Sequence, residues 1–505
     1  MTTWTQEQHD IFENIYTCKD VKAFVIEAVA GCGKSAMLLE ICKRHQEKHI
    51  LFLAFNRSTV QHINDKIQHK NLHTHTLHAY LLLLHNAANP DTVLESNLIA
   101  KLYYEQERYQ TVPYRNVRQA VDGIRLRGLV VDNCCLQRTE VDAFAIACQL
   151  VQQTIEKPNV VDFEGLVYLF STQMQYLQHT YDLVLVDEAQ DLNPAQCAVV
   201  CNLAQRPGTQ LIIVGDRQQS IYAYKMVFDS ILAMSSKIAQ SHGPSSVQKH
   251  NMTMCFRCPS KVVAIANFIN PSIRSAHSCP PGVVSWFDQV LQSNVLDKLY
   301  NRLRVQPCPR TLCMRRSNKQ ILQMMRQMYK DERSYNVKWL SPSIRDEIEI
   351  LMTRIIGLSD DDGCVEDFLS FSATSDLGEY CKYRWANIQR SDPTIITDKS
   401  AVVLEIINSC DPRWWLFLLQ NIISRISVMT GSYIVISTIH GTKGLTFHGT
   451  VVIVDYHTFT DQVEDRCLLY VALTRTTSEN LFLFTCRLCD VYSNVIPTSA
   501  IMSLK

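Results

Sequence analysis

The sequence has 505 residues, of which 47% are hydrophobic, so it is long enough for several folded domains. Its 49 Lys and Arg residues balance its 49 Asp and Glu residues, which excludes a strong overall positive field, and a polyanion would need a locally basic groove. No apolar run approaches the roughly 20 residues of a membrane-spanning helix, and "MTTWTQEQHD" carries no signal segment. We expect an intracellular, multidomain protein that does not contact a membrane.

The 19 cysteines are scattered along the chain, which is typical of free thiols in a reducing compartment. Two Cys-x-x-Cys pairs, Cys255/Cys258 and Cys486/Cys489, would together supply the four thiolates of a zinc site. Each pair ends an apolar, strand-like run, where small buried cysteines are common. We therefore favour buried thiols over zinc.

The first half of the chain alternates short β-branched runs with helical periodicity. The runs end in polar or glycine-rich turns, as in "AFVIEAVAGCGKS", "HILFLAFNRS", "YDLVLVDEAQD" and "TQLIIVGDRQQ". This alternation predicts parallel α/β units with functional groups at the carboxyl ends of the strands. Residues 80–165 read instead as helical, with "LHAYLLLLHNAA" and "EVDAFAIACQLVQQTI".

A second series of strands follows the stretch "QSHGPSSVQKHN", and it includes "TLCMRRSNKQ", "YIVISTIHGTKG", "GTVVIVDYH" and "NLFLFTC". We expect two α/β lobes, each a parallel sheet flanked by helices, joined near residue 245. The predicted first lobe comprises residues 1–79 and 166–250, with a helical insertion at 80–165. The predicted second lobe comprises residues 251–330 and 431–505, with an accessory insertion at 331–430.

The stretch "AVAGCGKS" lies between a predicted strand and a predicted helix. In a phosphate-binding loop, glycines let backbone N–H groups surround the anion, a lysine reaches the terminal phosphates and a hydroxyl coordinates Mg²⁺. Gly31, Gly33, Lys34 and Ser35 fit these roles, although Ala28 stands where the general pattern has glycine. The predicted nucleotide-binding loop comprises Ala28, Val29, Ala30, Gly31, Cys32, Gly33, Lys34 and Ser35.

Two acids end the apolar run "LVLVDEAQD". Asp187 is placed to hold Mg²⁺ and Glu188 to polarise an attacking water. Adjacent acids at a strand end are often merely solvated, but the upstream phosphate loop favours a catalytic interpretation. The acids and the loop together therefore predict a site for Mg²⁺ beside bound phosphate.

The motifs "AVAGCGKS", "VDEAQD", "VGDRQQSIYAYK", "STIHGTKGLTF" and "LLYVALTRT" occur in an order that resembles the superfamily 1 DNA helicases of the UvrD-like kind. "LFLAFNRS", "MCFRCP" and the compact second insertion are most similar to the helicase part of F-box DNA helicases, although we expect no F-box here. The resemblance implies two RecA-like P-loop NTPase lobes, with the residue 80–165 insertion 1B-like and the 331–430 insertion 2B-like.

The resemblance also implies roles around the nucleotide. Gln8 would read the adenine edge, and Phe256 would stack on its face. Gln219 would sense the γ-phosphate, and Arg257 and Arg475 would reach that phosphate from the second lobe, with Arg475 acting as an arginine finger. The implied catalytic residues are Lys34, Asp187, Glu188, Gln219, Arg257 and Arg475.

The resemblance also implies residues that contact the nucleic-acid strand: Phe55, Asn56, Thr76, His78, Tyr224, Arg316, Asn318 and His440. Aromatic rings that stack on bases and polar groups that hold phosphates give sequence-tolerant binding. Other interpretations stay open, because Phe55 could belong to the core, His440 could be structural and Tyr224 could pack between lobes. The stretch "VDFEGLVYL" is expected to be structural.

The sequence departs from the family pattern at two positions. Thr446 stands where the family has a glutamate near the ribose, which puts ribose discrimination in doubt. Lys225 replaces an arginine, which keeps the charge but loses the planar fork. The second insertion is also short, so regulation by it is not assumed.

The resemblance implies an ATP-dependent DNA helicase that moves 3′ to 5′ on single-stranded DNA and acts at duplex junctions. We expect a monomer with roles in replication, recombination or repair, in the nucleus or another site of DNA metabolism. One alternative is an ATP-switched nucleic-acid-binding factor that does not unwind. A phosphotransferase with a small acceptor would leave Gln219, Arg257 and the second lobe unexplained.

Overall fold

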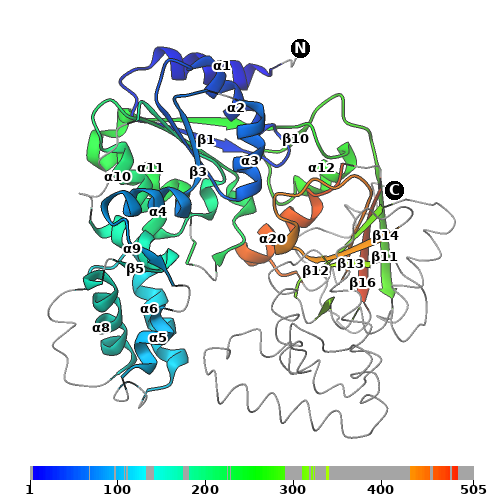
Figure 1. Ribbon diagram of the computed structural model, residues 1–505. Helices are drawn as coiled ribbons and strands as arrows, with labels where there is room; N and C mark the ends of the chain where they lie inside the picture. Colours follow the sequence, from blue (N-terminus) through cyan, green and yellow to red (C-terminus); the bar gives the residue numbers. More distant parts are fainter. Residues whose placement is uncertain are drawn as a thin grey trace, which may run out of the picture. The chain divides into compact units, whose positions relative to one another are not determined.

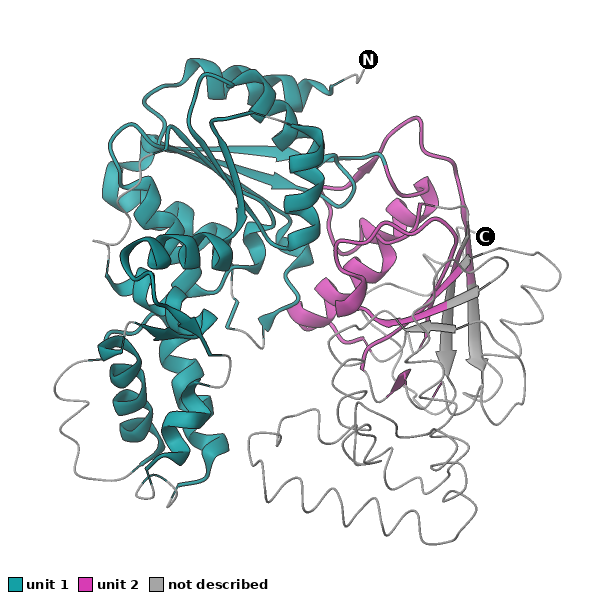
Figure 2. Cartoon of the chain, viewed as in Figure 1, with its two compact units in different colours: residues 1–256 teal, residues 257–505 magenta. Residues whose placement is uncertain are grey.

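The structure is a computed structural model that describes residues 4–290, 310–317, 320–321, 324, 337–339, 433–454, 459–477 and 480–486. Within the first range, residues 68, 96–97, 107–108, 110–111, 132–141, 158, 174–180, 224–225 and 228 are outside the description. The described chain divides into two compact units, residues 1–256 and residues 257–505 (Figure 2). None of the described helices is both long enough and apolar enough to cross a membrane.

The first unit is built on a sheet of six parallel strands in the order β3-β2-β6-β7-β1-β8. The strands are β1 (Ala23–Ala28), β2 (Ile50–Ala54), β3 (Leu72–Thr76), β6 (Leu183–Val186), β7 (Gln210–Gly215) and β8 (Val247–Met252). Strand β8 lies beyond residue 245 in the stretch "QSHGPSSVQKHN" and the residues after it, yet it pairs with β1 in this sheet. The parallel α/β architecture predicted for this region is confirmed.

Helices cover both faces of this sheet, as a wholly parallel sheet requires (Figure 1). They are α1 (Gln6–Thr17), α2 (Lys34–Arg44), α3 (Arg57–Lys66), α4 (Leu77–Ala88), α9 (Phe163–Thr172), α10 (Pro194–Ala204) and α11 (Ser230–His242). The buried side chains of α4, α9, α10 and α11 form one core with those on one face of β1, β2, β6 and β7. Strands β1, β2, β6 and β7 are buried almost throughout, which explains their continuous β-branched and apolar composition.

The helical insertion has a second, separate core formed by apolar side chains between residues 98 and 168. Its elements are β4 (Val93–Leu94), α5 (Leu98–Tyr104), α6 (Tyr114–Arg127), α8 (Ala143–Glu156) and β5 (Val160–Val161). Strands β4 and β5 pair in parallel. The helical character expected for residues 80–165 is present, whereas the short pair of strands was not anticipated.

A buried ion pair joins this insertion to α9. Arg125 Nη1 donates to both carboxylate oxygens of Asp162, at 2.9 and 2.8 Å, and Arg125 Nη2 donates to Thr154 Oγ1 at 3.1 Å. Asp162 also caps α9 by accepting from the Gly165 amide at 2.6 Å. A Cβ on Gly165 would lie 3.2 Å from Arg125 Nη2, so glycine leaves room for the pair. Asp162 thus has the structural role expected for "VDFEGLVYL".

The second unit contains a six-stranded parallel sheet in the order β11-β16-β15-β12-β14-β13. The strands are β11 (Val283–Val290), β12 (Arg310–Arg315), β13 (Val337–Trp339), β14 (Tyr433–Thr438), β15 (Thr450–Ile453) and β16 (Asn480–Cys486). Helices α12 (Ser260–Ala266) and α20 (Val463–Leu473) pack against each other in this unit. A second parallel α/β sheet was predicted, and the described strands confirm it.

Short elements complete the described chain. They are η3 (Ala189–Asp191), η4 (Arg217–Gln219), η6 (Pro244–Ser246), β9 (Met254–Cys255), β10 (Arg274–Ser275) and η8 (His440–Thr442). Apart from β13, the predicted accessory insertion at 331–430 lies outside the described residues.

Candidate nucleotide and nucleic-acid sites

The phosphate-loop candidate connects β1 to α2 at the carboxyl edge of the first sheet. Gly31 and Gly33 have φ values of +71° and +88°, a region that side-chain-bearing residues rarely adopt. Gly33 directly precedes α2 and places no side-chain cap on its first turn. Uncapped N–H groups at a helix N-terminus, with Lys34 and Ser35 as the first two helical residues, form a suitable site for an anion.

Several hydrogen bonds hold this loop from outside. Val29 donates its amide to Met252 O at 3.0 Å, and Phe256 donates its amide to Gly31 O at 2.9 Å. Gln8 Nε2 donates to Cys32 O at 3.4 Å, while Gln8 Oε1 accepts from the Thr5 amide in the capping box of α1. The predicted adenine-reading glutamine thus also fastens α1 to the loop.

The thiol within the loop is chemically quiet. Cys32 is buried, and burial raises its pKa to about 12.

The ring of Phe256, the predicted adenine-stacking residue, is 45% exposed and therefore accessible for stacking.

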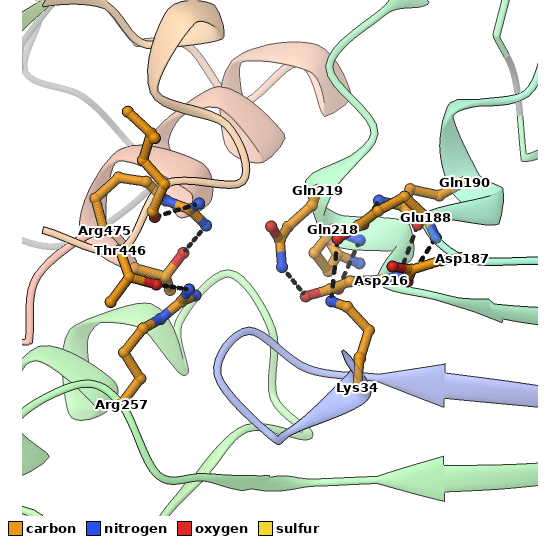
Figure 3. A network of polar contacts seen from close by, with 12 residues as sticks. Lys34, Asp187, Glu188, Gln190, Asp216, Gln218, Gln219, Arg257, Thr446 and Arg475 are labelled. Atoms are coloured by element: carbon orange, nitrogen blue, oxygen red, sulfur yellow. Dashed lines mark hydrogen bonds and ion pairs between the residues drawn. The ribbon is translucent and has the colours of Figure 1, made fainter. Parts of the chain in front are cut away.

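Lys34 lies among three carboxylates, as Figure 3 shows. Its Nζ is 4.0 Å from Glu188 Oε1. Burial alone would lower the pKa of Lys34, but the negative charges of Glu188, Asp216 and Asp187 together outweigh it and raise that pKa above its ordinary value. The lysine therefore stays protonated, as phosphate binding requires.

The strand order explains this gathering. Strand β7 lies between β6 and β1, so the residues that follow these three strands meet at one edge of the sheet. Asp187 follows β6, and it is buried. Burial and the neighbouring Glu188 raise the pKa of Asp187 to about 7.

Two residues of this network were missed by the sequence analysis. Gln190 Nε2 donates to Glu188 Oε2 at 2.5 Å, and Gln190 Oε1 accepts from the Asp216 amide at 3.0 Å. Asp216 Oδ2 in turn accepts from Gln219 Nε2 at 2.7 Å. Gln190 thus links the acids after β6 to the turn after β7, and Asp216 orients Gln219. The signal was present, because Asp216 directly follows a fully buried strand.

The donor set near Lys34 fits a divalent cation. The Ser35 hydroxyl and the Asp187 carboxylate are hard oxygen donors, the type that Mg²⁺ prefers. The buried carboxylates of Asp187 and Asp216, with that of Glu188 beside them, face the single positive charge of Lys34. Burial raises the pKa values of Asp187 and Asp216, and a bound cation would favour their charged forms.

In the second unit, Arg475 is almost completely buried, with 1% of its surface exposed. Its Nε donates to Val471 O at 2.8 Å, its Nη1 to Leu445 O at 3.1 Å and its Nη2 to Thr474 Oγ1 at 3.2 Å (Figure 3). Each of the three nitrogens therefore has an acceptor within the unit.

Arg257 contacts Thr446, the neighbour of Leu445, whose carbonyl oxygen accepts from Arg475. Its Nη1 donates to Thr446 Oγ1 at 3.3 Å (Figure 3), so the residue that departs from the family pattern engages one of the two predicted phosphate-binding arginines. The Nε of Arg257 is buried and has no hydrogen-bond partner among the described residues.

The predicted nucleic-acid contacts of the first unit follow β2 and β3. The ring of Phe55 is 39% exposed and stacks on Tyr222, with centroids 5.7 Å apart and planes inclined by 21°. Asn56 Oδ1 accepts from the Thr59 amide at 2.8 Å and caps α3, and Thr76 caps α4. These two polar side chains thus have structural roles in addition to any contact with a nucleic-acid strand.

Exposed rings extend this surface. His78 packs edge-on against Phe163, with centroids 5.5 Å apart, and the Phe163 ring is 37% exposed. The sequence analysis did not assign Tyr222 and Phe163 to the nucleic-acid site, although they lie within "VGDRQQSIYAYK" and "VDFEGLVYL". Tyr224 and Lys225 lie outside the described residues.

In the second unit, Arg316 follows β12 and His440 begins η8 after β14. These strands are parallel neighbours, and the Ile439 amide donates to Arg315 O at 3.0 Å, so the two predicted contacts lie at one edge of the sheet. Asn318 and the alternative zinc ligand Cys489 lie outside the described residues. Cys258 Sγ contacts Thr474 O at 3.6 Å.

Comparison with known proteins gives matches in both units. Residues 13–225 match a family model described as an AAA domain, and residues 433–482 match the UvrD-like helicase C-terminal domain. The first match contains the phosphate loop, the acids after β6 and Gln219. The second contains His440, Thr446 and Arg475.

Curated relatives give the same result. The chain is 34% identical over 113 residues to "ATP-dependent DNA helicase UvrD1" of Mycobacterium tuberculosis, which covers 20% of this chain and 14% of that protein. It is 33% identical over 131 residues to the "Probable DNA helicase II homolog" of Mycoplasma capricolum, covering 25% and 17%. With the protein of the same description in Mycoplasma pneumoniae it shares 22% identity over 319 residues, covering 54% and 43%.

The matched segments span less than half the length of each of these relatives. Family matches in both units and these relatives nevertheless agree with the ordered motifs. In both units the chain is similar to the UvrD-like superfamily 1 helicases.

Proposed function

We propose that the protein is an ATP-dependent DNA helicase or translocase that moves 3′ to 5′ on single-stranded DNA. The observation that carries the proposal is the position of Lys34, at the start of an uncapped helix and among Asp187, Glu188 and Asp216. This arrangement suits a nucleoside triphosphate with its cation, because the helix terminus and Lys34 attract phosphate while the acids can bind a cation. The three relatives reported above are named as DNA helicases, which supports DNA as the polymer.

Within this proposal, Ser35 and Asp187 hold Mg²⁺, which when bound neutralises charge on the β- and γ-phosphates. Lys34 contacts the same phosphates. Glu188 orients the attacking water, because its carboxylate is fixed by Gln190 at 2.5 Å. Gln219, held by Asp216, senses the γ-phosphate.

Gln8 and Phe256 are proposed to bind the adenine by its edge and by its face. Arg257 and Arg475 are proposed to stabilise the charge that develops on the γ-phosphate. The buried, unpaired Nε of Arg257 supports its assignment, since a buried donor without a partner is costly and a phosphate oxygen would satisfy it. The order of lobes and insertions expected from the sequence stays a proposal, with α4 and the whole of β8 assigned to the first lobe.

The nucleic-acid track is proposed to include Phe55, His78, Arg316 and His440, together with Tyr222 and Phe163. The stacked Phe55 and Tyr222 rings and the edge-on His78 and Phe163 rings supply the aromatic surfaces that single strands use. The protein is further proposed to unwind duplex junctions as a monomer. Its proposed roles are in replication, recombination or repair, in the nucleus or another site of DNA metabolism. The closer likeness to the helicase part of F-box DNA helicases stays a prediction.

The first test is ATP hydrolysis by the purified protein with Mg²⁺, with and without a poly-dT oligonucleotide. We expect stimulation by the single strand and its loss on chelation of Mg²⁺. A panel of duplexes with 3′ or 5′ tails, in DNA and in RNA, then tests direction and polymer. Unwinding only from 3′ DNA tails is the expected result. Stimulation without unwinding of any duplex would favour the ATP-switched binding factor, and absence of stimulation would exclude a motor.

A further inference from the structure

A buried carboxylate near the start of α20 has no role in the proposed hydrolysis. Asp465 is only 3% exposed, and it lies in the first turn of the helix, where a negative charge is favourable. Its Oδ2 accepts from the Thr460 amide at 2.9 Å and from Thr460 Oγ1 at 2.7 Å. These two bonds and the helix fix the position of the carboxylate.

The other oxygen of Asp465 faces Arg316. Arg316 Nη2 lies 2.6 Å from Asp465 Oδ1, and the Arg316 side chain remains 39% exposed. Burial alone would raise the pKa of Asp465, but the bonds from Thr460 and the ion pair with Arg316 lower it below its ordinary value, so the carboxylate is charged at neutral pH. The guanidinium is thus held by a buried charge, although the Arg316 side chain as a whole is partly exposed.

The guanidinium of Arg316 lies where we expect a nucleic-acid strand to bind. Arg316 directly follows β12, and His440 begins η8 two residues after the end of the neighbouring strand β14. Ligands of open parallel sheets bind at the carboxyl ends of the strands. A guanidinium has five N–H donors, and the Arg316 side chain is 39% exposed, so it can meet a phosphate oxygen while it is paired with Asp465.

We propose that Asp465 is a positioning residue that orients Arg316 toward the phosphates of a single nucleic-acid strand. The inference rests on the proposed function and deepens its nucleic-acid site. An arginine on a flexible stem loses about 2 kcal/mol of rotamer entropy when it is fixed. A buried partner makes that ordering before the strand arrives, so binding is tighter than it would be with a mobile arginine.

The test uses direct binding rather than hydrolysis. Fluorescence anisotropy measures the Kd of the full-length protein for a labelled dT oligonucleotide without nucleotide, for the wild type, Asp465→Asn, Arg316→Ala and the double variant. Asparagine keeps the shape and an acceptor for Thr460 but loses the charge. Thermal unfolding of each variant checks that it is folded.

We expect Asp465→Asn to raise the Kd about three- to tenfold, and Arg316→Ala to raise it at least as much. Arg316→Ala should also reduce the slope of log Kd against log salt by about 0.7, the value for one phosphate contact on a single strand. In the Arg316→Ala background, Asp465→Asn should cause no further change, because it acts through that arginine.

The matched control is the exposed ion pair between Arg466 and Asp461, at 2.8 Å beside the same helix turn. Asp461→Asn removes an equal charge and should leave the Kd within about twofold, since surface ion pairs contribute little. An equal weakening by Asp461→Asn would show that Asp465 acts only through general charge.

Three results would overturn the inference: an unchanged Kd in Asp465→Asn, a tighter Kd, or the same increase with and without Arg316. A tighter Kd would mean that Asp465 competes with phosphate for the arginine. Failure of the wild type itself to bind the oligonucleotide would overturn the proposed nucleic-acid function and this inference with it. Binding by the wild type with no effect of Asp465→Asn would overturn the inference alone.

Discussion

The two groups of charged residues in Figure 3 are stabilised in opposite ways. In the first unit, Lys34 faces three carboxylates, and the helix that begins with it has no side-chain cap. In the second unit, Arg475 is buried and each of its nitrogens donates to an oxygen of its own unit. In the first group burial raises the pKa values of Asp187 and Asp216, which a bound cation would lower, whereas the second group is internally satisfied.

This difference affects how mutations are interpreted. Loss of a residue from the first group should change the binding of charged ligands before it changes stability. Loss of Arg475 leaves the carbonyl oxygens of Val471 and Leu445 without this donor, so it should damage the fold as well as any catalytic role. Assays of the second unit must therefore separate folding from chemistry.

The largest effect is expected from Lys34→Ala, which tests the first side of this comparison. It removes the positive charge nearest to Glu188 and Asp216, so both nucleotide affinity and hydrolysis should be lost. Nucleotide binding by fluorescence and steady-state hydrolysis measure the two effects. Lys22→Ala is the control, because Lys22 Nζ donates only structural bonds to Arg206 O and Thr209 O in the described chain. Loss of hydrolysis in both variants would show that the effect is not specific to the loop.

Arg475→Ala tests the second side. We expect turnover to fall on the order of a thousandfold while nucleotide affinity is nearly unchanged. Because a buried, hydrogen-bonded guanidinium is lost, the free energy of unfolding should also fall by about 3 kcal/mol. Chemical denaturation and single-turnover hydrolysis measure the two effects separately. Equal loss of nucleotide affinity in Arg475→Ala and Lys34→Ala would contradict the finger assignment.

Gly215→Ala perturbs the first group without changing any charge. A Cβ at this position would lie 2.4 Å from Gln190 Oε1 and 2.9 Å from Ile231 Cδ1. Gln190 would have to move, and with it the bonds to Glu188 and Asp216, so we expect a loss of about 2 kcal/mol of stability and roughly tenfold slower hydrolysis. Gly123→Ala is the control, since open space surrounds that helical glycine and stability should rise slightly. Unchanged hydrolysis in Gly215→Ala would argue against a positioning role for Gln190.

The smallest effect is expected from Thr446→Val, which removes the acceptor for Arg257 Nη1 but keeps the shape. One hydrogen bond at a partly exposed site is worth about 0.5–1 kcal/mol, so turnover should fall about two- to fivefold. Thr446→Ser keeps the hydroxyl and should restore the wild-type rate. A full loss of activity in Thr446→Val would instead place the threonine itself at the nucleotide.

The sequence predicted what depends on local pattern. Continuous β-branched runs gave the parallel sheets, and the glycines of "AVAGCGKS" gave the turn before α2, because only particular residues adopt those backbone conformations. The family resemblance marked Lys34, Asp187 and Gln219, which the strand order brings to one edge of the first sheet.

Contacts between distant segments could not be predicted in the same way. Gln190 is one polar residue in a polar turn, and its link to Asp216 depends on β6 and β7 being neighbours. Asp465 looks like any acid in a first helical turn until Arg316, far away in the sequence, is placed beside it. Asn56 was predicted only as a contact for a nucleic-acid strand, and its role as the cap of α3 was not predicted.

The bond from the Phe256 amide to Gly31 O has a mechanical consequence. Phe256 is the last residue of the first unit, so the covalent tether to the second unit leaves from a point anchored on the phosphate loop itself. If the Gly31 peptide tilts when an anion binds, the backbone hydrogen bond from the Phe256 amide would transmit that movement to the start of the second unit. Among substitutions at position 256, only proline would cut that anchorage, because every other amino acid keeps the amide hydrogen.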